Sequence, residues 1–167
     1  MRQLTMGGTP ITVTGADLKI GQQAPDFKLL GLNFNEVKLS DFKGKILVIS
    51  CVPSIDTPVC DLQTRRFNQE AALLPEELCI LTVSKDLPFA QARWCGAHGI
   101  NKVMMASDFR DFGFAKDYGV LLEEMGLLAR AVFVIDKQGI IRAIEFVPEV
   151  GQEPDYEKVL IAIKQLI

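Results

Sequence analysis

The chain has 167 residues, of which 49% are hydrophobic and 23% are charged, a composition that is typical of a globular protein and excludes a disordered one. Its formal net charge of −3 gives no overall attraction to phosphate backbones or to anionic lipid, so neither nucleic acid nor a membrane is expected as a partner. The length predicts a single domain over residues 1–167.

Strands are predicted where apolar and β-branched residues run or alternate between turn residues. In chain order they are a hairpin over residues 5–14, then 27–32, 36–39, 45–52, 78–84, 103–106, 131–136 and 140–147. The runs at 45–52 and 78–84 are continuous and apolar, which is typical of strands buried on both faces. The last two runs flank a Lys-Gln-Gly turn and predict a second hairpin.

Helices are predicted where apolar residues recur at helical spacing among charges. In chain order they are residues 60–73, 87–95, 111–118 and 155–167. Pro75 is expected to stop the first helix and Gly96 to end the second. The last helix is amphipathic.

This alternation predicts an α/β fold in which helices cover both faces of a mixed central sheet. A βαβ unit followed by a ββα unit is the pattern of the thioredoxin-like fold, which is preceded here by an N-terminal β-hairpin extension. In such sheets the reactive site lies beyond the carboxyl end of a central strand, where a helix begins. The loop over residues 53–60 has that position.

No apolar stretch of signal-peptide length follows Arg2, and no apolar run reaches the ~20 residues that cross a bilayer. We therefore expect a cytoplasmic protein whose four cysteines, Cys51, Cys60, Cys79 and Cys95, are free thiols at rest. Cys51 and Cys79 fall inside apolar strand runs and are expected to be small core side chains. Cys60 and Cys95 fall at the ends of predicted helices.

Cys60 is the candidate for chemistry, because it lies in the predicted first turn of a helix. A helix N-terminus carries about half a positive charge and free N–H donors, which stabilise a thiolate. The hydroxyl of Thr57 can donate to the sulfur or to a bound oxygen, and Pro53 and Pro58 stiffen the loop. On position alone, a small buried cysteine behind an ordinary turn is an equally good interpretation.

Four stretches of sequence resemble the peroxiredoxins, and their thiol peroxidase branch in particular. They are the signature Pro53-xxx-Thr57-xx-Cys60 and residues 86–96, 129–136 and 153–157. Because these stretches are spread along the chain, the resemblance covers essentially all of it. It implies an atypical two-cysteine peroxiredoxin, a thiol-specific peroxidase that reduces hydrogen peroxide and organic hydroperoxides.

The resemblance also implies a role for each site residue. Cys60 would be the peroxidatic cysteine, which becomes a sulfenic acid, and Cys95 the resolving cysteine, which forms an intramolecular disulfide with it. Arg130 would hold its guanidinium near the sulfur. Thr57 would orient the peroxide, and Pro53 would shield the sulfenic acid from water.

The same resemblance implies thioredoxin as the reductant, a homodimer, and no metal, haem, flavin or other cofactor. Residues 119–128 are a few residues shorter than the family pattern, which leaves the substrate preference open. Two other functions stay open. A thiol–disulfide oxidoreductase on the same fold expects Cys-x-x-Cys, but Leu62 and Gln63 stand where the second thiol would be. A redox-sensing module, in which oxidation of Cys60 changes a partner interface, is the other alternative.

Overall fold

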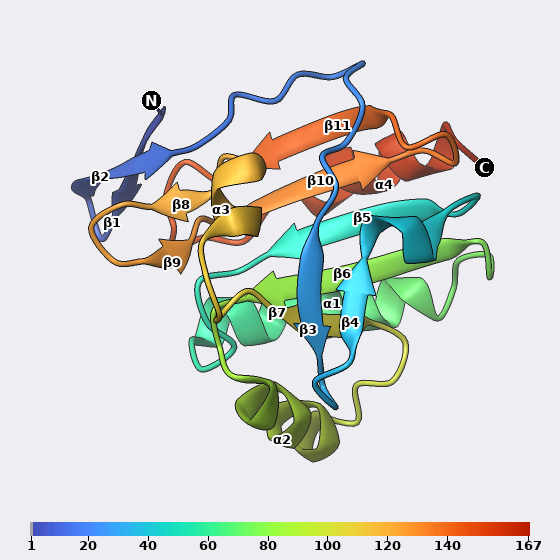
Figure 1. The fold of residues 1–167 in the computed structure, drawn as a ribbon, viewed down its shortest axis with the longest axis horizontal. Helices are drawn as coiled ribbons and strands as arrows, with labels where there is room; N and C mark the ends of the chain where they lie inside the picture. The colour runs from blue at the N-terminus through green and yellow to red at the C-terminus, as the bar shows by residue number, and fades with distance from the viewer. Residues whose placement is uncertain (1) are drawn as a thin grey trace.

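The computed structural model describes residues 2–167, and its elements follow the predicted chain order with one additional hairpin (Figure 1). The strands are Arg2–Met6 (β1), Thr9–Thr14 (β2), Lys28–Gly31 (β3), Glu36–Lys38 (β4), Ile46–Cys51 (β5), Leu78–Ser84 (β6), Met104–Ser107 (β7), Leu121–Leu122 (β8), Leu127–Leu128 (β9), Ala131–Ile135 (β10) and Ile141–Phe146 (β11). The helices are Pro58–Ala71 (α1), Pro88–His98 (α2), Gly113–Asp117 (α3) and Tyr156–Lys164 (α4), and Leu39–Phe42 (η1) is a 3₁₀ turn.

Seven strands form the central sheet in the order β11-β10-β5-β6-β7-β3-β4. The middle strands β5, β6 and β7 run parallel, whereas the strands on either side of them pair antiparallel, so the sheet is mixed. The predicted thioredoxin-like α/β fold with a mixed sheet is confirmed.

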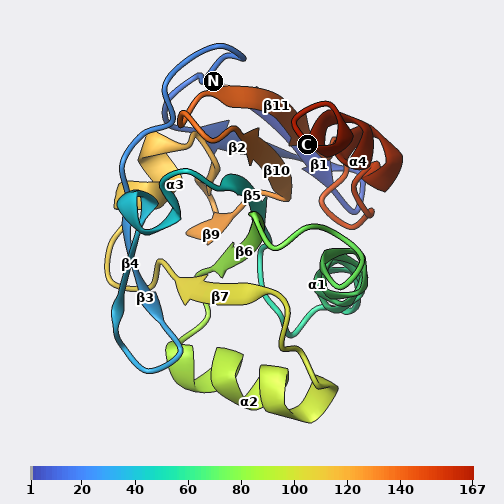
Figure 2. The ribbon, with the colours of Figure 1, turned by 90° about the vertical axis from the view of Figure 1, so that its right-hand side faces the viewer.

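Alternate residues of β5 face opposite sides of this sheet and separate two cores. Ile46 and Val48 pack with apolar side chains of α1 and α4. Leu47, Ile49 and Cys51 face the other core, which includes α3. Figure 2 shows α1 and α4 beside each other on one face of the sheet, α3 on the other, and α2 beside β7.

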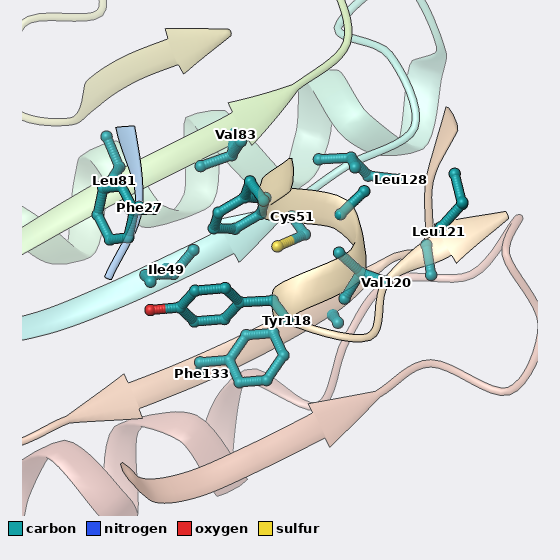
Figure 3. Close-up of a cluster of buried hydrophobic side chains, with 14 of the residues drawn as sticks. Phe27, Ile49, Cys51, Leu81, Val83, Tyr118, Val120, Leu121, Leu128 and Phe133 are labelled. Carbon is teal, nitrogen blue, oxygen red and sulfur yellow. The ribbon is translucent and has the colours of Figure 1, made fainter. Parts of the chain in front are cut away.

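Cys51 lies inside the core on the α3 face, as Figure 3 shows. Its neighbours there include Phe27, Tyr118 and Phe133, whose rings pack edge to face. Burial raises the pKa of the Cys51 thiol far above its usual range. The prediction that Cys51 is a core side chain is confirmed. Cys79 packs against the same core but is only partly buried.

The predicted end of α2 is wrong. The helix continues through Gly96 to His98, because a glycine inside a helix costs only about 1 kcal/mol relative to alanine. It ends at Gly99, which adopts a left-handed φ of 63° and donates its N–H to the carbonyl of Cys95. α1 also begins two residues earlier than predicted, at Pro58, because a proline fits the first turn of a helix, where its missing N–H has no partner within the helix.

The additional hairpin is β8 and β9, two strands of two residues each within residues 119–128. β8 pairs with β2, so the confirmed N-terminal hairpin belongs to a second sheet of order β1-β2-β8-β9. Pairs of leucines are too short to produce a strand pattern in the sequence, and here the pairing with β2 determines the conformation. None of the helices that the structure describes in residues 2–167 is long and apolar enough to cross a membrane.

Candidate active site

The loop between β5 and α1 brings Cys60 into the first turn of α1, where Pro58 is the first helical residue. Thr57 is the N-cap, and its hydroxyl oxygen accepts a hydrogen bond of 3.3 Å from the backbone N–H of Cys60. The positive end of the helix dipole therefore lies beside the Cys60 sulfur. The Cys60 side chain is fully buried.

Arg130, which directly precedes β10, points its guanidinium at Cys60 and is only 2% exposed. Its Nη2 donates to Cys60 Sγ at 3.1 Å. Its Nη1 donates to Gln63 Oε1 and its Nε to the carbonyl of Val150, both at 2.8 Å. Two hydrogen bonds to α1 and one to the loop after β11 thus fix the orientation of the guanidinium group against the sulfur.

The positive charge of Arg130 has no carboxylate partner in the part of the chain that the structure describes. None of the ion pairs found within residues 2–167 includes this residue. A buried charge without a counter-ion is strongly unfavourable. Of the three acceptors around the guanidinium, only the sulfur of Cys60 is able to become an anion. A negative charge on the Cys60 sulfur would compensate the positive charge of Arg130.

Gln63 is a site residue that the sequence analysis does not identify. Its side chain is buried and links Arg130 to β5, because its Nε2 donates to Ser50 Oγ at 2.7 Å. A helical spacing of three residues places Gln63 on the same face of α1 as Cys60, which is the signal that could have found it.

Gln63→Leu keeps the volume of the side chain but removes the acceptor for Arg130 Nη1. We expect the Cys60 thiol to react with iodoacetamide about three- to tenfold more slowly, the factor that one hydrogen bond contributes. The rate is measured by peptide mapping of alkylated Cys60. Gln69→Leu, an exposed change on the same helix, is the control, and equal rates in the two variants would remove Gln63 from the site.

The hydroxyl of Thr57 does not point at the sulfur in this structure. It lies 3.1 Å from the carbonyl of Ser54, to which it donates, while its oxygen caps the helix. The hydroxyl proton is therefore engaged within the loop. Pro53 is buried at the start of the same loop.

Asp86 fastens this loop to the end of β6, another contact that the sequence analysis does not identify. One carboxylate oxygen accepts from Ser54 Oγ at 2.7 Å, and the other accepts from the backbone N–H of Ile55 at 2.9 Å and from Ser84 Oγ at 2.7 Å. β5 and β6 are parallel neighbours, so their carboxyl ends meet at one edge of the sheet. The position of Asp86, two residues after a predicted strand, was the available signal.

Cys95 lies near the end of α2 and is buried with Ile55, Trp94 and Met105. Its Sγ is 3.0 Å from Met105 Sδ. Burial raises the pKa of the Cys95 thiol to about 11, so in this docked position it stays protonated at neutral pH.

Cys60 and Cys95 lie over the same face of the sheet. Ser50, which bonds the helix of Cys60, and Met105, which touches Cys95, are both register partners of Thr82 and therefore point to one face. Cys51 and Cys79 belong to the core on the opposite face. All four thiols are free in the structure. Within residues 2–167, no group of three or more His, Cys, Asp or Glu side chains is arranged to hold a metal ion.

Comparisons with known proteins agree on one family. The model of the AhpC/TSA family matches residues 20–144. A thiol peroxidase of Bacillus subtilis (strain 168) is 51% identical over 167 residues, which are 100% of this chain and 99% of that protein. A thiol peroxidase of Oceanobacillus iheyensis is 53% identical over 160 residues, which are 96% of this chain and 97% of that protein. A solved peroxiredoxin-like protein from Aquifex aeolicus has a TM-score of 0.93 and 41% identity, covering 100% of this chain and 98% of that chain.

Proposed function

The chain belongs to the AhpC/TSA family, in its thiol peroxidase branch, and we propose that it reduces hydrogen peroxide and organic hydroperoxides with Cys60 as the peroxidatic cysteine. The observation that carries this proposal is the buried guanidinium of Arg130, 3.1 Å from Cys60 Sγ. Among the three hydrogen-bond partners of this guanidinium, the Cys60 sulfur is the one that can become an anion, and a thiolate is the nucleophile that attacks a peroxide.

In the first step, the Cys60 thiolate attacks the terminal oxygen of the hydroperoxide. The O–O bond breaks, the sulfur is oxidised by two electrons to a sulfenic acid, and the alkoxide or hydroxide leaves and takes up a proton. Arg130 stabilises the negative charge that moves from sulfur to the leaving oxygen. Its fixed position means that no reorganisation is needed when this charge develops.

Thr57 and Pro53 complete the site in this proposal. A rotation of the Thr57 hydroxyl away from the Ser54 carbonyl would direct its proton to a bound peroxide oxygen, which gives Thr57 its orienting role. Pro53, buried beside the loop, lacks an N–H group and would exclude water from the sulfenic acid.

Cys95 then acts as the resolving cysteine. Ser50 and Met105 lie two strands apart, which corresponds to about 10 Å, whereas bonded sulfurs are about 2 Å apart. Since the two cysteines are held over these different strands, α2, the first turn of α1 or both have to move before a disulfide forms. Docked and protonated, Cys95 is unreactive until that movement exposes it.

The proposal includes a dithiol reductant of the thioredoxin type, which regenerates both thiols, and a cytoplasmic location, where such reductants operate.

The proposal also includes a homodimer. Leu87 and Phe89 at the start of α2 are 49% and 71% exposed, and the Phe34 ring lies 4.9 Å from that of Phe89. An exposed apolar patch of this kind is typical of an interface, and sedimentation measures the oligomeric state.

A thiol–disulfide oxidoreductase is the less favoured alternative. Its second thiol would occupy the position of Gln63, whose buried amide instead binds both Arg130 and Ser50.

The deciding experiment is a coupled assay in which thioredoxin, thioredoxin reductase and NADPH drive the reduction of hydrogen peroxide or cumene hydroperoxide by the wild-type protein. We expect continuous NADPH oxidation with thioredoxin and a single equivalent of peroxide consumed without it. Peptide mapping after that single turnover should find Cys60 joined to Cys95. Protein alkylated beforehand is the control, and an untreated protein that consumes no peroxide would overturn the proposal.

A further inference from the structure

Asp61, the residue after Cys60, joins the helix of one cysteine to the helix of the other. Its Oδ1 accepts a hydrogen bond of 3.0 Å from the indole N–H of Trp94, the neighbour of Cys95 in α2. His98 Nε2 lies 3.5 Å from the same oxygen. The side chain of Asp61 is itself held in place, because Arg65 Nη2 donates to its Oδ2 at 2.6 Å.

Trp94 and His98 form one unit at the end of α2. Their rings stack with centroids 4.7 Å apart, and His98 Nδ1 lies 2.9 Å from the carbonyl oxygen of Trp94. The turn between them contains Cys95. The contact with Asp61 therefore docks that whole turn, with its thiol, on the first turn of α1.

Contacts before and after this turn hold the neighbouring chain in place. If the turn is released from Asp61, only the segment between these contacts becomes free to move. Before it, the buried Gln91 donates to Ser84 Oγ and to the carbonyl of Ala106, both at 3.0 Å. After it, the backbone N–H of Lys102 donates to Asn68 Oδ1 at 2.8 Å. Between the anchors at Gln91 and Lys102, the main polar contact of this segment with α1 is therefore the one with Asp61.

That segment is also weak as a helix. Gly96 lies within it, is exposed, and has no atom within 4 Å of the position that a Cβ would take. Glycine disfavours a helix because its backbone loses more conformational freedom than that of other residues. The contact with Asp61 compensates for this weakness at the point where Cys95 has to come free.

We propose that Asp61 is a positioning residue that latches the Cys95 turn of α2 to α1 and thereby sets the rate of disulfide formation. The inference rests on the proposed function, which requires Cys95 to reach the Cys60 sulfenic acid. Trp94 and His98 are the two side chains that the latch holds.

In the step that the latch controls, the released Cys95 thiolate attacks the sulfenic sulfur of Cys60. The S–S bond forms as the S–O bond breaks, and hydroxide leaves and combines with the proton of the Cys95 thiol as water. The sulfenic acid is reduced and the Cys95 thiol is oxidised, so no further oxidant is needed.

The latch is tested by mixing the reduced protein rapidly with one equivalent of hydrogen peroxide, followed by acid quenching and mass spectrometry. Sulfenic acid and disulfide differ in mass, so the two rates are obtained separately. Trp94→Phe removes the indole N–H, and Asp61→Asn removes the charge of the acceptor. We expect the disulfide step to accelerate about fivefold in each variant, the factor of one hydrogen bond.

A double variant distinguishes the latch from a loss of packing. Because both changes weaken the same bond, Trp94→Phe combined with Asp61→Asn should accelerate the disulfide step little more than either change alone. The control is Arg66→Gln, which breaks the ion pair between Arg66 and Glu70 within α1; no hydrogen bond or ion pair found within residues 2–167 joins Arg66 to α2. In Trp94→Phe the rate of sulfenic acid formation should equal that of the wild type.

A change in the opposite direction completes the test. Gly96→Ala stabilises the helical turn and should slow the disulfide step about fivefold. Its sulfenic acid would persist longer, so more of it would become sulfinic acid at high peroxide. Unchanged or slower disulfide formation in both Trp94→Phe and Asp61→Asn would overturn the latch. A wild-type protein that forms no sulfenic acid at all would instead overturn the proposed function.

Discussion

Replacing Cys60 by serine is expected to abolish peroxide reduction, with a loss of at least about a thousandfold. The reason is that a neutral serine hydroxyl is a much weaker nucleophile than a thiolate. The serine Oγ keeps an acceptor for Arg130 Nη2, so the fold should be retained. The measurement is NADPH oxidation with thioredoxin and thioredoxin reductase. Circular dichroism checks that the variant is folded.

Variants of the other three cysteines distinguish the steps of the catalytic cycle. Cys95→Ser should consume one equivalent of peroxide at the wild-type rate and then stop, because its sulfenic acid has no resolving thiol. Cys51→Ala and Cys79→Ser should turn over like the wild type, since both thiols belong to the core on the opposite face of the sheet. Peroxide turnover by Cys60→Ser would contradict the assignment of the nucleophile and direct attention to the remaining thiols.

The sequence predicts the part of the site that is local in the chain. Residues 45–52 form a continuous apolar run, which predicts a buried strand, and Pro53, Thr57 and Cys60 follow it directly. A buried strand that leads into a helix leaves its loop at the carboxyl edge of the sheet, whatever the rest of the chain does. The location of Cys60 was therefore predictable without any knowledge of distant residues.

The contacts that the Cys60 sulfur makes with the rest of the chain are not local. Arg130 is 70 positions away and Gln63 meets it only because β10 and β5 are neighbours in the sheet. The contact between Asp61 and Trp94 similarly depends on how α2 lies beside α1. No periodicity in a single sequence encodes such pairs, so these hydrogen bonds could only come from the structure.

The end of α2 was not predictable, for a different reason. Gly96 and Gly99 are both plausible helix terminators in the sequence, and helix propensity does not distinguish them. The contacts of Trp94 and His98 with Asp61 hold the last turn in helical form past Gly96. The free energy that these tertiary contacts contribute is thus comparable to the cost of one glycine within a helix, and the helix continues past Gly96.

Arg130→Met is expected to slow the reaction of reduced protein with peroxide about a hundredfold, the loss that follows removal of one fixed donor from a charge-stabilising site. The methionine is apolar and of similar length, so it would fill the space of the arginine stem without providing charge. The rate is measured by rapid mixing with hydrogen peroxide, and the rate of Cys60 alkylation at neutral pH should fall with it.

The same variant should lose little stability. Val150 and Gln63 each lose a donor, which costs about 1–3 kcal/mol for a buried acceptor. This cost is offset because the buried guanidinium, which has no carboxylate partner among residues 2–167, is removed as well. We expect a free energy of unfolding within about 2 kcal/mol of the wild-type value, measured by denaturant titration. Activity and stability are then separable at this residue.

Arg130→Lys tests whether charge alone is sufficient. An ammonium group keeps the positive charge but lacks the planar fork with which Arg130 reaches Cys60, Gln63 and Val150 together. We expect it to recover only part of the lost rate. Arg142→Met, which removes a half-exposed arginine from its ion pair with Asp136, is the matched control and should leave the rate unchanged. If Arg130→Met reacted with peroxide as fast as this control, the guanidinium would be a structural group and the proposed activation of Cys60 would be wrong.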